Sequence, residues 1–566
     1  MCGIVGIQYK TKTPVNQACL KKMADRIHHR GPDDEGFYID GSIGFYHKRL
    51  SIIDLTTGKQ PMTDDGCTIV FNGEIYNYIE LRQDLVQKGH VFRTHSDTEV
   101  ILKMYLEYGE KAIDLLNGMF AFLLHDKKQQ KLLAARDHFG IKPLYIYDDG
   151  EKTLFASEIK AIIAHPGVEA ALNEAALNEY LTFQFIRGEN TLFRQIRKVL
   201  PGHYLRIDLR NNSSRQIQYW EPNFKVDTHH TQEYFIYEVQ RLLEDTIKIQ
   251  LRSDVPLGTY LSGGVDSSIV SVLAARSIPN GLKTFTGAFE EGQEYDESAY
   301  AKIVADHCQA EMHKVYPTEK EFVDLLPNLI YHMDEPAVGP GLFPQYMVSS
   351  LASKNVKVVL GGQGGDEIFG GYTRYVVAYL EQALKGAIFE TNDEAEHVVS
   401  LQSIIPNLPC LQQYIPMMRN FWKKEAFEDM DRRYFHLIDR SENALELYTG
   451  DFRKGYDRED IFCRFQKIFN HPDTLSYYNK MTHFDMFGSL PGLLQVEDRV
   501  SMAVSLESRV PLLDKRIVDL VSSIPVQMKF KGGEIKYILK KAVKNILPKE
   551  ILNRKDKMGF PVPLKI

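Results

Sequence analysis

Residues 255–268 read VPLGTYLSGGVDSS, and this stretch decides how the second half of the chain folds. The apolar run Val255–Leu261 predicts a buried strand, and Ser267–Arg276 has helical spacing. Between them, Gly263 and Gly264 lack a Cβ, so the backbone amides of the turn can approach an anion closely. The N-terminus of the following helix also favours negative charge. A bare Gly-Gly turn is more often only a tight connection, but this stretch predicts a strand, an anion-binding turn and a helix in succession.

The same alternation of strands and helices continues on both sides of this turn. The predicted elements are a long amphipathic helix at Gln232–Arg252, a strand at Lys283–Phe289, a helix at Asp296–His307 and a buried strand at Val356–Leu360. Such alternation implies a mainly parallel sheet that helices cover. From about Tyr375 onward the pattern is mostly helical, and residues 381–478 contain no motif with a chemical interpretation.

A second glycine-rich turn, GGQGGDEIFGGY at residues 361–372, follows the strand that ends at Leu360. Ligands bind at the carboxyl ends of the strands in open parallel sheets. Asp366 and Glu367 offer the hard oxygen ligands that Mg²⁺ prefers. The alternative is a surface turn with solvated acids, which fits poorly with the six glycines around them.

The first 210 residues also alternate short strands with helices. Strands are predicted at Ile4–Tyr9, Ser42–Tyr46, Cys67–Phe71, Phe120–His125 and Leu132–Arg136, and helices at Tyr78–Lys88 and Asp97–Tyr108. We expect Ser96 to cap the second helix and to form a capping box with Glu99. The polar stretch Asn211–His230 is expected to be the boundary to the second half.

The composition excludes several classes of protein. A chain of 566 residues is long enough for about two to four domains with a large core. Hydrophobic residues make up 44% and charged residues 25%, so disorder is not the main state. The net charge of −7 leaves no basic excess for a nucleic-acid backbone. The longest apolar runs, such as Met119–Leu124, are too short for a bilayer. We therefore expect neither a nucleic-acid partner nor a membrane.

The cysteines and the N-terminus bear on the cellular setting. The six cysteines, at positions 2, 19, 67, 308, 410 and 463, form no CxxC pair and no zinc spacing with histidine. This usage predicts a reducing, cytoplasmic setting. The opening residues MCGIVGIQYK contain no apolar segment or cleavage site of a secretory signal, so none is expected.

Cys2 is a candidate nucleophile. Removal of the initiator methionine before a small residue would leave a thiol and a free α-amine on the same residue. Such an amine has a pKa of about 7.7–8.0, so it can accept the thiol proton near neutrality. Taken alone, Cys2 is more often a small buried residue at the start of an edge strand.

Cys2 stands at the head of a series of motifs. They are CGIVG at 2–6, HRGPD at 29–33, RLSI at 49–52, NGEIYN at 72–77, SDTE at 96–99, GMFAF at 118–122 and RDHFG at 136–140. Over about the first 200 residues they closely resemble the glutaminase domain of class II glutamine amidotransferases, in the N-terminal-nucleophile hydrolase superfamily. The resemblance implies a four-layer αββα fold.

The resemblance also implies a role for each residue of the first site. Cys2 attacks the glutamine side-chain amide, Asn72 and the Gly73 backbone amide form the oxyanion hole, Arg49 binds the glutamine α-carboxylate, Asp97 pairs with its α-ammonium, and Glu74 joins the pocket. These residue types suit the chemistry, because a guanidinium matches a carboxylate bidentately and neutral donors stabilise an oxyanion. Singly, Arg49 or Asp97 would more often be a solvated charge, but the set in chain order argues against coincidence.

The string SGGVDS at 262–267 resembles the pyrophosphate loop of ATP pyrophosphatases, which split ATP between its α and β phosphates and adenylate a carboxylate. A P-loop is excluded because Gly-Lys-Ser/Thr is missing. The resemblance implies that Asp266, and with it Asp366, holds Mg²⁺, and that Lys536 stabilises charge on the adenylated intermediate. The residues that it implies for ATP or pyrophosphate binding are Tyr260, Leu261, Ser262, Gly263, Gly264, Asp266, Ser267, Ser268, Gly287, Gly361, Gly362 and Asp366.

Both halves, in this order, resemble the glutamine-hydrolysing asparagine synthetase family. Further matching motifs are EDRVSMA at 497–503, ESRVPLLD at 507–514, KYIL at 536–539 and KMGFP at 557–561. The resemblance implies a glutaminase domain at 2–212 and, at 232–566, an adenylating domain with a parallel ATP-pyrophosphatase sheet and added helices. It implies glutamine, aspartate and ATP as substrates, Mg²⁺ as cofactor, asparagine, glutamate, AMP and pyrophosphate as products, and a homodimer as one possible assembly. Family members often continue past Pro561, so the sequence resembles a shortened chain.

One position departs from the family pattern. Well-studied members read SGEGSDE where this chain reads GGQGGDE at 361–367, so Gln363 replaces a glutamate implicated in forming or reacting the aspartyl-adenylate. An amide forms hydrogen bonds but takes no proton at neutral pH. The stretch MDEPAVG at 333–339 also differs from better-known members. We keep Gln363 as a catalytic-site position, and the identity of the acceptor stays open.

Two alternatives therefore stand beside amidation of aspartate. One is a related amidotransferase or lactam-forming enzyme that acts on another carboxylate. The other is a non-catalytic homologue that senses glutamine. A lactam-forming enzyme would have little use for an intact glutaminase set, so Cys2, Arg49, Asn72 and Asp97 argue against that variant.

Overall fold

The computed structural model describes residues 2–278, 281–292, 295–336, 339–390, 401–405, 408, 411, 415–423, 425–441, 446, 448–531, 534–554 and 562. The motif at 557–561 and part of the stretch 333–339 lie outside the described residues. Within them, no helix combines the length and the hydropathy that a membrane span requires.

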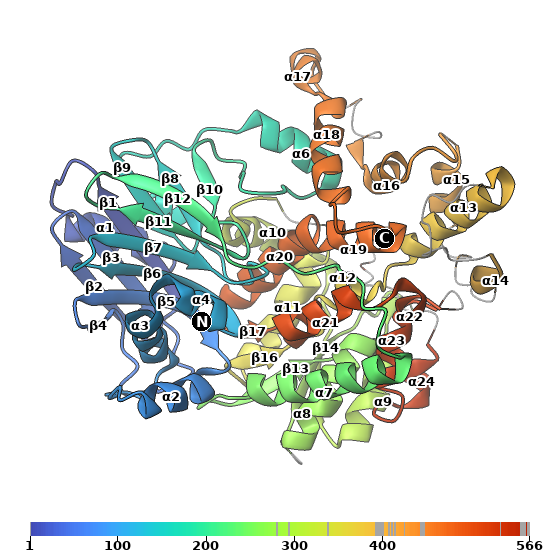
Figure 1. Ribbon diagram of the computed structural model, residues 1–566, viewed down its shortest axis with the longest axis horizontal. Helices are drawn as coiled ribbons and strands as arrows, with labels where there is room; N and C mark the ends of the chain where they lie inside the picture. The colour runs from blue at the N-terminus through green and yellow to red at the C-terminus, as the bar shows by residue number, and fades with distance from the viewer. Residues whose placement is uncertain are drawn as a thin grey trace.

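Two six-stranded antiparallel sheets form the framework of the N-terminal half (Figure 1). The first runs in the order β10 (Ile196–Lys198), β8 (Tyr145–Asp148), β9 (Lys152–Ala156), β1 (Gly3–Tyr9), β3 (Ile43–Arg49) and β2 (Asp34–Asp40). The second runs in the order β12 (Ser213–Gln218), β11 (His203–Asp208), β7 (Lys131–Arg136), β6 (Gly118–Asp126), β5 (Cys67–Ile75) and β4 (Met62–Asp64).

Alternating side chains along these strands build four layers. Successive residues of a strand point to opposite faces of its sheet, so Ile4 lies in the core between the two sheets while Val5 packs beneath helices. In the same way, Val70 faces the other sheet and Phe71 faces α3. The αββα prediction is confirmed. The helices of this half are α1 (Gln17–Asp25), α2 (Tyr78–Gln87), α3 (Asp97–Tyr108), α4 (Ala112–Leu115), α5 (Ile159–Ile163) and α6 (Glu174–Phe183), with short 3₁₀ turns at His28–Arg30 and Gly109–Lys111.

In this half the boundary stretch contains a strand that was not predicted, and one local prediction is wrong. The polar stretch Asn211–His230 contains this strand, β12, which pairs with β11 as an exposed edge strand and needs no apolar residues. Ser96 does cap α3, but Glu99 closes no capping box. The Glu99 carboxylate instead accepts from the backbone amides of Arg93 and Thr94, at 2.9 and 2.7 Å.

The second half is built on a five-stranded sheet whose neighbouring strands are all parallel. Its order is β15 (Glu311–Val315), β14 (Lys283–Gly287), β13 (Leu257–Tyr260), β16 (Val358–Leu360) and β17 (Glu507–Arg509). The parallel sheet was predicted, whereas β15 and β17 were not. The helices that accompany the sheet are α7 (Gln232–Gln250), α8 (Val265–Ser277), α9 (Ser298–Cys308), α10 (Glu319–Met333), α11 (Leu342–Ser353) and α12 (Gly365–Phe369).

The first part of the predicted helical remainder, from Thr373 to Phe487, lies at the upper right of Figure 1. Most of the later helices pack in the same core as the parallel sheet. The aromatic core of the first part, which includes Tyr375, Phe435 and Phe465, explains why residues 381–478 carry no chemical motif. The remaining helices are α13 (Thr373–Phe389), α14 (Leu401–Ile404), α15 (Ile415–Phe421), α16 (Met430–Ile438), α17 (Gly450–Gly455), α18 (Arg458–Phe469), α19 (Tyr477–Phe487), α20 (Leu490–Met502), α21 (Lys515–Ser523), α22 (Val526–Lys529), α23 (Tyr537–Ala542) and α24 (Lys549–Leu552), with a 3₁₀ turn at Pro511–Leu513.

The two halves share one hydrophobic core. Leu50, Tyr76 and Met119 of the N-terminal half belong to the same buried cluster as Leu494 and Val510 of the second half. The two candidate sites therefore belong to one packed body.

Candidate active sites

Strand register brings the residues of the first site together. Gly3 of β1 pairs with Lys48 of β3, so Cys2, just before β1, lies beside Arg49 at the end of β3. Asn72 and Gly73 belong to β5 in the facing sheet. The predicted nucleophile thus lies at the start of β1, beside the end of β3, and a hydrogen bond joins it to Asn72 of β5.

Both the backbone amide and the thiol of Cys2 contact neighbouring residues. Its backbone N–H donates to Asn72 Oδ1 at 3.0 Å, and its Sγ lies 3.9 Å from the carbonyl oxygen of Leu50. Burial raises the pKa of the Cys2 thiol, and the nearby Arg49 charge opposes that rise. A buried thiol needs a base to become a nucleophile, which is the role that we predicted for its own α-amine.

Asn72 and Gly73, the predicted oxyanion donors, each have an unusual environment. Asn72 is fully buried, and its Nδ2 has no hydrogen-bond partner among the described residues. Leaving a buried donor unpaired costs free energy, so a site that does so is prepared for an acceptor that arrives later. Gly73 has φ +150°, and a Cβ there would lie 2.0 Å from the carbonyl oxygen of Met119, so only glycine fits.

The charged residues of the pocket are buried as well. An Arg49 Nη2 donates to the backbone oxygen of Asp54 at 2.6 Å, which fixes the guanidinium. Burial raises the pKa of Asp97 to about 6, although the backbone amide of Ile75 donates to it at 3.0 Å. Burial and the Glu507 carboxylate raise the pKa of Glu74. A nearby cation would stabilise the ionised form of these two buried carboxyl groups. The α-ammonium of an amino acid is such a cation.

The second site is a cavity of about 500 Å³ at the carboxyl ends of the parallel strands. The predicted residues on its wall are Tyr260, Leu261, Ser262, Gly264, Asp266, Ser267, Gly287, Gly361, Gly362, Gln363 and Asp366. Gly263 and Ser268 lie beside the cavity and not on its wall. Gly263 has φ +72° and lies against Tyr300. Ser268 is buried in the first turn of α8. This helix begins at Val265 and not at Ser267 as predicted.

Lys536 joins the two glycine-rich turns. Its Nζ lies 2.5 Å from Asp266 Oδ2 and 2.5 Å from Asp366 Oδ1. Lys536 caps α23 in the left-handed conformation, with φ +56°, which is unusual outside glycine and typical of functional positions. Lys536 thus lies just before α23 and not inside the helix, and its side chain contacts a carboxylate from each turn.

The donor set around Lys536 fits Mg²⁺ bound together with phosphates. Asp266 and Asp366 present carboxylate oxygens from facing turns, and a Cβ at Gly365 would lie 2.6 Å from the Asp266 carboxyl. Mg²⁺ binds proteins through one or two carboxylates and takes its other ligands from substrate phosphates and water. Among the described residues there is no group of three or more histidine, cysteine, aspartate or glutamate side chains that could hold a metal ion.

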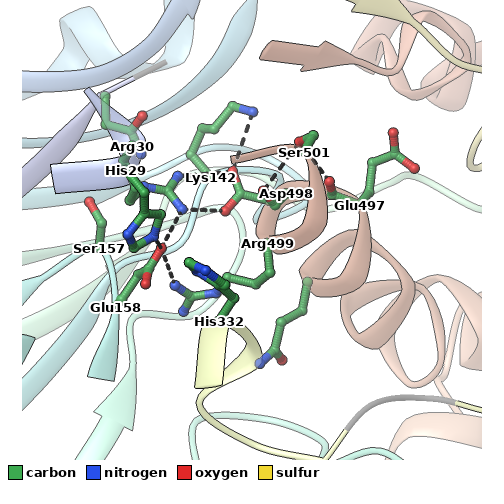
Figure 2. Close-up of polar contacts among 12 residues, drawn as sticks. His29, Arg30, Lys142, Ser157, Glu158, His332, Glu497, Asp498, Arg499 and Ser501 are labelled. Atoms are coloured by element: carbon green, nitrogen blue, oxygen red, sulfur yellow. Dashed lines mark hydrogen bonds and ion pairs between the residues drawn. The ribbon is translucent and has the colours of Figure 1, made fainter. Parts of the chain in front are cut away.

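A buried ion network between the halves was not predicted. Figure 2 shows Arg30 reaching from the N-terminal half to Asp498 on α20, with Nη1 and Nη2 donating at 2.8 and 3.0 Å. Its Nε donates to the backbone oxygen of Cys2 at 3.1 Å, and Nη1 also donates to Glu158 at 2.9 Å. Arg499 lies 2.9 Å from Glu158. The motifs HRGPD and EDRVSMA were the available signals, but neither motif indicates which residue it pairs with.

Comparisons with known proteins match this division of the chain. The family model described as asparagine synthase matches residues 238–566, and the one described as glutamine amidotransferase domain matches residues 1–220. Glutamine-hydrolysing asparagine synthetase 1 of Bacillus subtilis strain 168 is 36% identical over 573 residues, covering 100% of this chain and 87% of the relative. Asparagine synthetase 3 of the same organism is 31% identical, covering 99% of this chain and 87% of the relative.

More distant matches extend the set. Amidase chry2 of Gibberella zeae is 30% identical over 590 residues, covering 95% of this chain and 84% of the relative. A solved glutamine phosphoribosylpyrophosphate amidotransferase from B. subtilis aligns with a TM-score of 0.30 and 16% identity over 64% of this chain and 75% of that one, too weak a likeness to argue from.

The fold and the matched domains define a glutamine amidotransferase domain joined to an ATP-pyrophosphatase-type domain. More specifically, this chain is a member of the asparagine synthetase family.

Proposed function

We propose that this protein transfers the amide nitrogen of glutamine to the β-carboxylate of aspartate, with cleavage of ATP to AMP and pyrophosphate. The observation that carries the proposal is that one chain holds both prepared centres. Cys2 lies beside an unpaired oxyanion donor in the first, and Lys536 lies between two carboxylates on the cavity wall in the second. The asparagine synthetase relatives, matched over nearly the whole chain, support the choice of substrates.

In the first half, the Cys2 thiolate adds to the carbonyl carbon of the glutamine side chain. The oxyanion that forms accepts from Asn72 Nδ2 and the Gly73 amide, which stabilise charge as it develops. Arg49 binds the α-carboxylate, and Asp97 with Glu74 binds the α-ammonium. Collapse of the adduct releases ammonia and leaves a thioester that water hydrolyses to glutamate.

In the second half, the aspartate carboxylate attacks the α-phosphorus of ATP, because a free carboxylate offers ammonia no leaving group. The anion-binding turn at 262–267 and the turn at 361–366 would hold the phosphates, with Lys536 balancing their charge. Asp266 and Asp366 would hold Mg²⁺, which supplies charge neutralisation to the departing pyrophosphate. Ammonia then displaces AMP from the acyl-adenylate.

Ammonia has to move from one half to the other without meeting bulk water, where it would become ammonium. The shared core of Leu50, Tyr76, Met119 and Leu494 supports a dry connection between the halves. The domains are proposed as an amidotransferase unit that includes β12 and an adenylating unit that begins with α7. A cytoplasmic setting is proposed because the described cysteines are free thiols, and the homodimer stays a prediction.

The competing function is amidation of a different carboxylate, and Gln363 on the cavity wall favours it. An ATP–pyrophosphate exchange screen over carboxylic acids separates the two, because exchange reports adenylation of the true acceptor. We expect aspartate to support the fastest exchange. Exchange with another acid and none with aspartate would contradict the proposal, and exchange with no acid would indicate the glutamine-sensing homologue.

A further inference from the structure

The anion-binding turn at 262–267 is contacted from its outer side by an arginine from the end of the described chain. The inner side of the turn lies on the cavity wall, with Ser262, Gly264 and Ser267, whereas Gly263 is not on that wall. Arg554, two residues after α24, donates from Nη1 to the carbonyl oxygen of Gly263 at 3.2 Å. Arg554 is not on the cavity wall either, so it contacts the turn without facing the space for the phosphates.

Two further contacts fix the guanidinium of Arg554. Its side chain is 4% exposed and forms an ion pair with Glu297, which caps the N-terminus of α9. The guanidinium carbon also lies 4.0 Å from the ring centre of Tyr300, in the first turn of α9. A planar guanidinium can serve two acceptors at once and stack on an aromatic ring. Arg554 therefore ties the anion-binding turn to α9.

The peptide that Arg554 contacts cannot be held by a side chain of its own. Gly263 has φ +72°, and a Cβ there would lie 2.5 Å from the Cβ of Tyr300, so the position requires glycine. Glycine has the widest backbone freedom of all residues. The orientation of this peptide therefore depends on contacts that its neighbours make with the carbonyl group.

The direction of the Gly263 carbonyl fixes where the next amide points. In a trans peptide, the C=O and the following N–H lie on opposite sides of one plane. Because the carbonyl is directed at Arg554, the Gly264 N–H is directed the other way, where it lies 3.4 Å from Oγ of Ser262 on the cavity wall. This contact is long for a hydrogen bond, so the amide can still donate to a stronger acceptor such as a phosphate oxygen.

We propose that Arg554 is a positioning residue for ATP: it holds the Gly263 carbonyl, so that the Gly264 amide faces the phosphates. The proposal rests on the proposed binding of ATP at this turn. The competing role is electrostatic, because Arg554 also neutralises Glu297, a carboxylate on the cavity wall that would repel phosphates. Variants of the full-length protein separate these two roles.

Calorimetric titration with Mg²⁺–ATP, without glutamine or aspartate, measures the affinity that the proposal concerns. Arg554→Met should weaken ATP binding about 10- to 100-fold, the range for losing a hydrogen bond from a charged group. The matched control is Arg433→Met, which breaks a buried ion pair with Glu381 and should leave ATP affinity unchanged. Unchanged affinity in Arg554→Met would overturn the proposal. An equal loss in both variants would also overturn it, because the loss would then follow from reduced stability.

A double variant distinguishes the hydrogen bond from the charge. Glu297→Gln combined with Arg554→Met removes both charges and still releases the Gly263 carbonyl. Its ATP affinity should stay at least about tenfold below that of the unaltered protein. Recovery of the unaltered affinity would show that Arg554 only neutralises Glu297, and the positioning role would fail.

Arg554→Lys provides the test if Arg554→Met has a much lower urea midpoint and folds poorly. Lysine keeps a cation beside Glu297 but lacks the planar fork that serves the carbonyl and the carboxylate together. We expect ATP affinity to fall about 2- to 10-fold, as for the loss of an ordinary hydrogen bond. Unaltered affinity in Arg554→Lys would contradict the proposal.

ATP–pyrophosphate exchange adds a kinetic criterion. In Arg554→Lys the KM for ATP should rise while kcat changes less, because the turn contacts the phosphates before and during the reaction. A lower kcat with an unchanged KM would overturn the positioning role. If the unaltered protein binds no Mg²⁺–ATP, the proposed function and this proposal fail together, whereas ATP binding that neither Arg554 variant weakens removes this proposal alone.

Discussion

Replacing Asn72 tests the glutaminase site most sharply, because this one side chain has two separate contacts. Its Oδ1 accepts from the backbone of Cys2 at 3.0 Å, and its buried Nδ2 has no partner among the described residues. Asn72→Ala removes both groups. Loss of one oxyanion donor costs about 100- to 1,000-fold in kcat, which corresponds to about 2.7–4 kcal/mol in the transition state.

The assay is glutamate release from glutamine, with ammonia-dependent asparagine formation as the internal control. We expect kcat for glutamine to fall by at least that factor with a smaller change in KM, because the oxyanion exists only in the transition state. Asn72→Asp keeps an acceptor for the Cys2 amide and removes the donor, so it should lose a similar factor. Near-normal kcat in either variant, with the ammonia reaction intact, would refute the oxyanion assignment.

Four further changes test other parts of the account. Cys2→Ala should abolish glutamine hydrolysis and leave ammonia-dependent synthesis intact. Full glutaminase activity in this variant would show that Cys2 is not the nucleophile. Asp266→Asn should reduce asparagine synthesis from either nitrogen source, because several kcal/mol of transition-state stabilisation are lost, while glutamine hydrolysis survives. Normal ATP consumption in this variant would show that the turn has only a structural role. The pKa of Asp97 is raised to about 6, so its carboxyl is protonated below that pH and no longer attracts the α-ammonium of glutamine. The KM for glutamine should therefore rise as the pH falls through 6. A KM that does not change with pH would contradict the role of Asp97. Arg30→Met removes both guanidinium hydrogen bonds to the buried Asp498 and leaves only Lys142, at 3.7 Å, beside that carboxylate. Urea unfolding should therefore show a loss of about 3 kcal/mol, and an unchanged midpoint would show that the network adds no stability.

Residues that lie close together in sequence were predictable. The strand–turn–helix around Gly263, the two glycine-rich turns and the motifs of the first half each combine local composition with a chemical purpose. Cys2 and Asn72, which the family resemblance assigned to one site, are joined in the structure by a hydrogen bond of 3.0 Å. The αββα layering was implied by the family resemblance, and the alternation of side chains along each strand gives its physical reason.

What escaped prediction depends on distant or backbone-specific contacts. Arg30 and Asp498 are 468 positions apart, and nothing near either residue specifies the other. β12 is an exposed edge strand with a polar composition, so its pattern matches a loop. The left-handed conformation of Lys536 is a property of packing, and composition does not encode it locally.

The central claim is that amide nitrogen passes from glutamine to aspartate through an acyl-adenylate on this single chain. The direct measurement is to incubate the enzyme with glutamine labelled with ¹⁵N in its side-chain amide, unlabelled ammonium, aspartate and ATP, and to follow the products by mass spectrometry. The account predicts asparagine enriched in ¹⁵N, with AMP and pyrophosphate formed in equal amounts to it. Unlabelled asparagine, or AMP formed at the same rate without aspartate, would contradict it.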